Sequence, residues 1–265
     1  MVVIGHQLPR RRRRRAWFIF LFGLLAAVVL LLVGNGVIAL LRALDRPAKP
    51  SSGALLYATD FSAENASNVD WLQEPGQSST QIADGVMRIS IDEVRSIYSV
   101  LKRDFRDIDA RVNASITAAT GDFTEYGIVF RYHDDNNYYM FLLRGDGAYS
   151  VQMIKNGEPD VISTWQRAPS IKSGLNQINQ LRVVASDDSF QFFVNDEPLP
   201  LCLKGSDRRS TWSGPDTGKC ISNNQQTSIS FKDNSFADGK IGVGARADSP
   251  GMRVAFDNVL IFGPN

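Results

Sequence analysis

Residues Tyr126–Tyr149, YGIVFRYHDDNNYYMFLLRGDGAY, decide the fold of this 265-residue chain. Apolar side chains occupy every second position at its start, and mostly small or polar residues stand between them. A period of two is typical of a β-strand with one buried face, because successive side chains point to opposite faces. The DDNN and GDG segments are rich in turn-forming residues. The stretch therefore predicts consecutive antiparallel strands joined by tight turns.

The same alternation continues on both sides of this stretch. Apolar positions with a period of two include Ile108, Ala110, Val112, Ala114, Ile116, Leu181, Val183, Ala185, Phe193, Ile241, Val243, Val254 and Phe256. Polar turn pairs separate these runs, as at Asp84-Gly85, Gly121-Asp122, Asn156-Gly157, Asp187-Asp188 and Asp238-Gly239. Many short strands with polar turns predict an all-β fold, an antiparallel sandwich or barrel. The sequence contains no phosphate-binding loop or dinucleotide fingerprint.

Three segments together resemble a known group of domains. They are Tyr126–Tyr149, Gln180–Leu199 (QLRVVASDDSFQFFVNDEPL) and Gly239–Phe262 (GKIGVGARADSPGMRVAFDNVLIF). The chain resembles the laminin-G-like, concanavalin-A-like domains of bacterial surface proteins, including those labelled family 16 glycoside hydrolase-like or keto-disaccharide hydrolase-like. This resemblance implies an antiparallel jelly-roll β-sandwich. It also implies that Leu55–Phe61 pairs with Val254–Phe262.

A long apolar run precedes the strand-rich part. Six arginines, Arg10–Arg15, lead into Ala16–Leu41, which contains no charged residue. At ~1.5 Å rise per residue, a helix of this length crosses a ~30 Å hydrocarbon core. A buried core helix and a cleaved signal peptide are the alternatives. A signal peptide has an apolar region of only ~7–15 residues and a small-residue cleavage site, which this run lacks. We therefore predict a transmembrane signal-anchor α-helix over residues 16–42.

The charge distribution predicts the orientation of this helix. Basic residues stay on the cytoplasmic side, so residues 1–15 form a cytoplasmic tail and residues 55–265 an extracytoplasmic domain. Residues 43–54 are a linker that contains two prolines. We expect a single-pass protein of the cell membrane, with membrane lipid as a partner of the helix and of the arginines.

The part beyond the helix is acidic. The first 50 residues hold nine basic residues and one acidic residue, and the remainder hold 20 and 27. Binding to nucleic acid depends on neutralising phosphates with basic side chains. The composition therefore argues against nucleic acid as a partner.

One polar side chain interrupts the apolar run near its outer end. Asn35 lies between Gly34 and Gly36, and small residues allow a second helix to approach closely. This pattern predicts a helix–helix contact with other subunits of a membrane complex. The alternative is that the amide lies close enough to the headgroups to contact water.

The chain has two cysteines, Cys202 and Cys220. Their spacing does not match a zinc motif, and both lie in the predicted extracytoplasmic part, where disulfides persist. We predict that they form a disulfide bond.

The sequence lacks the motifs of the related enzymes. Active family 16 hydrolases carry an E-x-D-x-x-E strand, and this chain has none; Asp104, Asp107 and Asp109 have the wrong spacing. No catalytic triad is apparent, and His133 has no nearby Ser or Cys partner. We expect a protein without enzyme activity, although loops can assemble a glycoside-acting site without a linear motif.

The resemblance also implies a metal position. Domains of this type often hold a structural Ca²⁺ at the sheet edge, and Asp257 of the F-D-N-V segment matches a ligand position there. The alternative is that Asp257 hydrogen-bonds the first strand. We expect no cofactor other than this Ca²⁺.

Sugar rings stack on aromatic faces and are held by amides, carboxylates and arginines. By alternation, Arg131 should point away from the core face of its strand. The predicted ligand-binding residues are Arg131, Tyr139, Gln152, Trp165 and Trp212. Core packing is the alternative for Tyr139 and Trp165. The sequence thus favours a membrane-anchored module that binds glycan or a cell-envelope polymer, with an accessory subunit of a membrane complex or a glycoside-acting enzyme as alternatives.

Overall fold

The computed structural model describes residues 46–121, 124–203, 209–210, 220–221 and 227–265, together with 24, 28 and 30. The chain forms two compact units, Met1–Arg46 and Pro47–Asn265. No helix within the described residues is long and apolar enough to span a bilayer. Most of the predicted segment 16–42 lies outside them, so the signal anchor stays a prediction.

The second unit is built almost entirely of strands. They are β1 (Leu55–Thr59), β2 (Ser79–Ala83), β3 (Val86–Ile91), β4 (Ser96–Phe105), β5 (Ile108–Ala118), β6 (Thr124–Asp134), β7 (Asn137–Arg144), β8 (Ala148–Lys155), β9 (Glu158–Arg167), β10 (Asn179–Ser186), β11 (Ser189–Val194), β12 (Glu197–Pro198), β13 (Arg209–Ser210), β14 (Cys220–Ile221), β15 (Phe231–Lys232), β16 (Gly239–Ala247) and β17 (Met252–Phe262). One 3₁₀ helix, η1 (Ala66–Asp70), follows β1. The predicted all-β class is confirmed for this unit.

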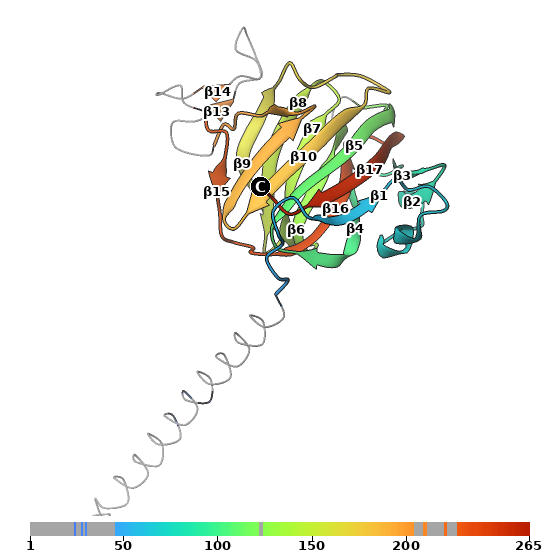
Figure 1. The fold of residues 1–265 in the computed structure, drawn as a ribbon. Coiled ribbons are helices and arrows are strands. Elements are labelled where there is room, and N and C mark those ends of the chain that lie inside the picture. The colour runs from blue at the N-terminus through green and yellow to red at the C-terminus, as the bar shows by residue number, and fades with distance from the viewer. Residues whose placement is uncertain are drawn as a thin grey trace, which may run out of the picture. The chain divides into compact units, whose positions relative to one another are not determined.

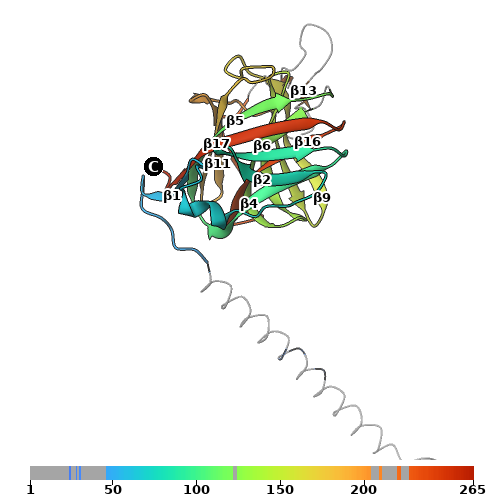
Figure 2. The same ribbon diagram turned by 90° about the vertical axis from the view of Figure 1, so that its right-hand side faces the viewer.

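The strands form two large antiparallel sheets that pack face to face (Figures 1 and 2). The nine-stranded sheet has the order β12-β11-β10-β5-β17-β3-β2, with β1 beside β17 and β15 beside β11. The six-stranded sheet has the order β4-β16-β6-β7-β8-β9. The predicted pairing of the first and last strands is confirmed, since Ala58 lies opposite Leu260 and Thr59 opposite Val259.

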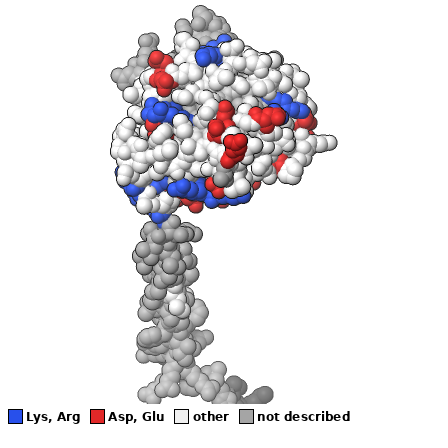
Figure 3. All heavy atoms as spheres, turned by 45° about the vertical axis from the view of Figure 1, so that its right-hand side comes forward, with Lys and Arg blue, Asp and Glu red and all other residues white. Residues whose placement is uncertain are grey.

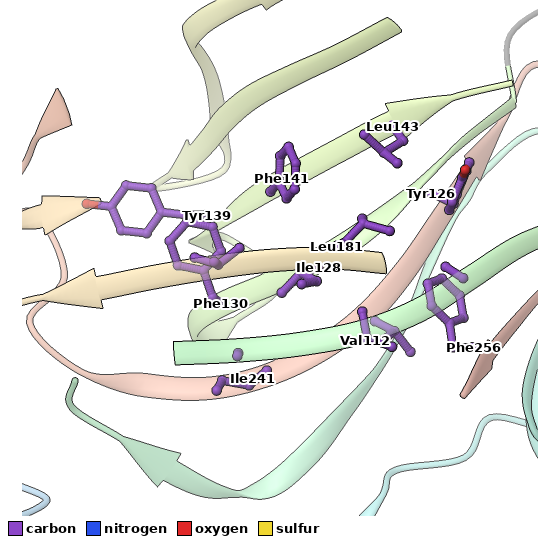
Figure 4. Packing of buried hydrophobic residues seen from close by; sticks show 14 of the residues in the cluster. Val112, Tyr126, Ile128, Phe130, Tyr139, Phe141, Leu143, Leu181, Ile241 and Phe256 are labelled. Carbon is purple, nitrogen blue, oxygen red and sulfur yellow. The ribbon is translucent and has the colours of Figure 1, made fainter. Parts of the chain in front are cut away.

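Alternating side chains from both sheets fill the space between them. Ile128, Phe141 and Ile241 of the six-stranded sheet meet Val112 and Phe256 of the nine-stranded sheet, and all five are buried (Figure 4). Each fully buried aliphatic or aromatic side chain contributes about 1.5–3 kcal/mol of transfer free energy. The period of two seen in the sequence is therefore the pattern that specifies this core.

The outer face of the nine-stranded sheet carries an ion-pair cluster around the buried carboxylate of Asp109. Arg182 donates from Nε and Nη2 to the two carboxylate oxygens of Asp109, at 2.7 and 2.8 Å, and Arg111 donates to the same carboxylate at 2.9 Å. Burial raises the pKa of Asp109, but the hydrogen bonds from Arg111 and Arg182 outweigh burial and lower the pKa below its ordinary value.

This cluster predicts a loss of stability in acid. A folded-state pKa below the unfolded value of about 3.9 stabilises the protein above that pH. The contribution is lost as the pH falls through the folded-state pKa. The difference in unfolding free energy between the wild type and Asp109→Asn should therefore be largest near neutral pH and shrink below about pH 4. Urea unfolding across this range measures it, and a pH-independent difference would contradict the assignment.

Cys202 and Cys220 form the predicted disulfide, with their Cα atoms 5.3 Å apart. Cys202 is buried beside β9, where its N–H donates to the Ser163 hydroxyl at 2.9 Å. Closing a loop of 18 residues stabilises the fold by about 3 kcal/mol in the chain-entropy model.

Candidate functional site

The outer face of the six-stranded sheet, which points away from the core, carries a second apolar cluster. Buried residues of this cluster are Val129, Tyr138, Met140 and Leu142, and Tyr98, Tyr132, Ile154 and Trp165 pack against them. In β6 and β7 these residues alternate with the core residues. Both faces of the centre of this sheet are therefore apolar, although only one of them faces the other sheet.

Glycines leave room for an aromatic ring across this face. Gly244 of β16 lies opposite Tyr98 of β4 and Gly127 of β6. A Cβ atom at Gly244 would lie 2.3 Å from Cδ1 of Tyr98, which no real structure allows. The Tyr98 ring thus lies over Gly244 on the outer face of the sheet. Its hydroxyl lies 3.0 Å from the Tyr138 hydroxyl.

This arrangement forms a pocket, which we call the tyrosine pocket, with a volume of about 430 Å³. Its lining residues are Leu72, Gln73, Glu74, Arg95, Ser96, Ile97, Tyr98, Val100, Tyr132, Asp135 and Tyr138. The Tyr138 ring contacts the other two, with centroids 5.4 Å apart for Tyr98 and Tyr138 and 5.6 Å apart for Tyr132 and Tyr138. Its volume lies within the ~300–1,000 Å³ range that is usual for small-molecule sites.

Polar groups converge on the rim of the tyrosine pocket. The Tyr132 hydroxyl donates to Asp135 at 2.6 Å, and Arg95 Nη2 donates to Glu74 at 3.2 Å. Burial raises the pKa of both Tyr132 and Tyr138 above the ordinary value for a tyrosine. The pocket therefore combines flat apolar walls with hydrogen-bond donors and acceptors.

A smaller pocket of about 290 Å³ adjoins the first, since Arg95 and Ser96 line both. Glu125 and Arg246 form an ion pair in its wall. Burial raises the pKa of Glu125, against the opposing effect of Arg246.

Two predicted ligand-binding residues lie in the core instead. The backbone φ of Arg131 is +47° and the β6–β7 register shifts after Phe130, so the alternation breaks here. The predicted outward orientation of Arg131 is wrong, because its side chain is only 2% exposed. Tyr139 is also buried; it stacks on Phe130 (Figure 4) and donates to Asp233. Its neighbour Tyr138 is the tyrosine that faces outward.

Gln152 and Trp165 do lie on the outer face, but neither lines the tyrosine pocket. Gln152 is buried and its amide donates to the Ser150 hydroxyl at 3.3 Å. Trp165 is half-buried, with the Arg144 guanidinium 5.2 Å from the centre of its ring. They flank the site at the β8–β9 side of the sheet.

The remaining predicted site residues are Trp212, the three helix-contact residues and Asp257. Trp212 and the helix-contact residues Gly34, Asn35 and Gly36 lie outside the described residues. Asp257 is half-buried and accepts from Asn258, at 2.6 Å from its N–H and 2.9 Å from its side-chain amide. No group of three metal-ligating side chains occurs within the part of the chain that the structure describes. A Ca²⁺ at Asp257 stays a prediction.

Most residues of the tyrosine pocket do not stand out in the sequence. Tyr98 of β4 and Tyr132 of β6 lie on either side of β16, the strand that contains Gly244. Glu74 and Arg95 come from loops. The signal that was available is the glycine spacing in GKIGVGA, which marks positions where another group crosses a strand.

Comparison with family models finds no match, and comparison with curated protein sequences finds none either. Solved structures do match. The carbohydrate-binding module CBM66 from Bacillus subtilis is 15% identical, with 73% of this chain and 95% of that chain covered and a TM-score of 0.52. A protein with a galectin-like fold from Bacillus subtilis is 13% identical (80% and 97% covered, TM-score 0.53). A β-glucanase from Bacillus licheniformis is 9% identical (81% and 100% covered, TM-score 0.50). These likenesses show the fold: the described strands form a jelly-roll β-sandwich with a galectin-like fold.

Proposed function

We propose that this protein is a membrane-anchored, extracytoplasmic glycan-binding module whose ligand occupies the tyrosine pocket. The observation that carries the proposal is the pocket itself, in which Tyr98, Tyr132 and Tyr138 meet beside the charged groups of Glu74 and Asp135. The fold supports it, because one structure that it resembles is a carbohydrate-binding module.

The chemistry of the pocket suits a sugar better than an apolar ligand. A sugar ring has an apolar face, which packs on an aromatic ring, and a rim of hydroxyl groups that need hydrogen-bond partners. The tyrosines supply the ring faces. Arg95 and the tyrosine hydroxyls supply donors, while the carboxylates supply acceptors. A neutral or weakly charged glycan, such as a cell-envelope polysaccharide, fits this set.

The location in the proposal rests on sequence. The apolar run of residues 16–41 follows six arginines, and the disulfide supports an oxidising compartment for the β-sandwich. Alkaline extraction of membranes tests the anchor, and a chain released into the supernatant would contradict it.

Binding to a glycan panel tests the ligand class. The purified full chain in lipid nanodiscs should bind at least one cell-envelope polysaccharide or oligosaccharide. Empty nanodiscs are the control for binding to the lipid. A panel without a binder would contradict the proposal, and sugar products released during incubation would point to the glycoside-acting alternative instead.

A further inference from the structure

The β-sandwich carries basic side chains around residues 47–54, where the preceding chain joins it. Residues 51–265 hold more acidic than basic residues. Figure 3 nevertheless shows basic side chains gathered along one edge, the lower edge in that view, with acidic side chains among them, and Figure 1 places residues 47–54 at the same edge. Lys49 belongs to this edge, since it contacts Asp187 of the β10–β11 turn at 2.9 Å.

Two cations of this surface are directed at backbone oxygens. Lys102 donates to the Val69 carbonyl at 2.9 Å, and Arg103 donates to the Leu56 carbonyl at 3.2 Å. Both side chains are exposed. Within the described residues neither has an ion-pair contact with an acidic side chain, so their charges are available to a partner.

Exposed apolar side chains accompany these cations. Val69 of η1 is 72% exposed and Leu55 at the start of β1 is 59% exposed. Scattered exposed apolar residues are ordinary. Here, however, Lys102 reaches the backbone of Val69 itself, and Arg103 reaches the residue after Leu55. Apolar groups beside Lys and Arg are the composition of surfaces that lie in a bilayer interface.

We propose that this surface, formed by Leu55, Val69, Lys102 and Arg103, docks on the bilayer through anionic lipid headgroups. The inference rests on the membrane anchor of the proposed function. If the anchor ends at residue 42, the six residues 43–48 that precede Lys49 reach about 21 Å at ~3.5 Å per residue. Lys49 is already bound to the β-sandwich. The short tether keeps this edge near the headgroups of the extracytoplasmic leaflet, where each basic residue gains binding free energy from any anionic lipid present.

Docking at this surface would not use the side chains of the ligand site. None of its four residues lines the tyrosine pocket. Docking would limit how the β-sandwich turns about its tether, so that the pocket is held at a fixed height and orientation relative to the membrane.

An environment-sensitive fluorophore tests the proposal. Because the native cysteines are joined in a disulfide, Val69→Cys introduces a single labelling site in the full chain. Ile178→Cys is the matched control: Ile178 is 58% exposed, and its loop bonds to Ile116 near the far end of β5. Both proteins are reconstituted in vesicles of phosphatidylcholine alone or mixed with phosphatidylglycerol.

The label at residue 69 should shift to shorter emission wavelength in the anionic vesicles only, and the label at residue 178 should not shift. About 1 M salt, which reduces the Debye length to ~3 Å, should reverse the shift. Lys102→Gln and Arg103→Gln should each lower the docked-to-undocked ratio about fivefold, whereas the exposed Lys172→Gln should not change it.

Equal emission at residues 69 and 178 in anionic vesicles would overturn the proposal, and so would a shift that the two charge variants leave unchanged. Alkaline extraction of the same vesicles reports on the anchor separately. A chain that is extracted but still shows the charge-dependent shift would refute the anchor and support the docking surface.

Discussion

Replacing Arg131 with alanine is expected to lower the free energy of unfolding by about 3–5 kcal/mol. The guanidinium is buried and joins three parts of the chain. It donates to the carbonyls of Phe236 and Asp187, both at 2.5 Å, and lies over the Phe190 ring, 4.7 Å from its centre. The buried Asp107 carboxylate lies 4.0 Å away. The alanine variant leaves the buried Phe236 carbonyl, the partly buried Asp187 carbonyl and this carboxylate without the guanidinium, and it opens a cavity.

Urea unfolding of the wild type and the variant measures this effect. Arg167→Ala is the matched control, because Arg167 makes a 3.0 Å ion pair with Asp146 but is 52% exposed. Exposed pairs contribute about 0–1 kcal/mol. Arg131→Lys should lie between the two, since it retains the charge and loses the paired donors. Equal losses for Arg131→Ala and Arg167→Ala would show that the buried contacts do not stabilise the sandwich.

Replacing Tyr98 with alanine is expected to weaken glycan binding about 30-fold or more. Tyr98 forms one wall of the pocket and holds the Tyr138 hydroxyl at 3.0 Å. Truncating a buried aromatic residue at the centre of a binding site commonly costs about 2 kcal/mol or more, which is about 30-fold in Kd. Isothermal titration with the glycan that the panel identifies measures the change.

Two further variants make this result specific. Tyr98→Phe retains the ring across Gly244 and should lose only the hydrogen bond, so that its affinity should fall less than that of the alanine variant. Trp165→Ala removes an aromatic side chain from the same face but outside the pocket, and it should change Kd by less than about twofold. A large loss for Trp165→Ala with normal binding by Tyr98→Ala would place the ligand at the β8–β9 side of the sheet.

The sequence predicts the sandwich well because its core obeys one rule. The core residues of β5, β6 and β10 occupy every second position, from Ile108 to Ile116, Tyr126 to Phe130 and Leu181 to Ala185, and the pairing of β1 with β17 agrees with the resemblance. The rule fails where backbone geometry interrupts it. A positive φ at Arg131 and the register shift beside it turn a predicted surface side chain into the core.

The site is less predictable because it is assembled from residues far apart in the chain. Glu74 and Tyr138 meet in one pocket although 64 residues separate them. Which of Tyr138 and Tyr139 faces outward depends on which alternate residues of β7 point to the core. The sequence does not show this, because Met140 and Leu142 make the outward face of β7 as apolar as its core face.

The most direct test of the central proposal is a crystal structure of the protein with a bound oligosaccharide from the panel. A sugar ring should lie within van der Waals contact of the Tyr98 or Tyr132 ring, with its hydroxyls hydrogen-bonded to Glu74, Arg95 or Asp135. A sugar bound elsewhere on the sandwich, with the tyrosine pocket empty, would contradict it.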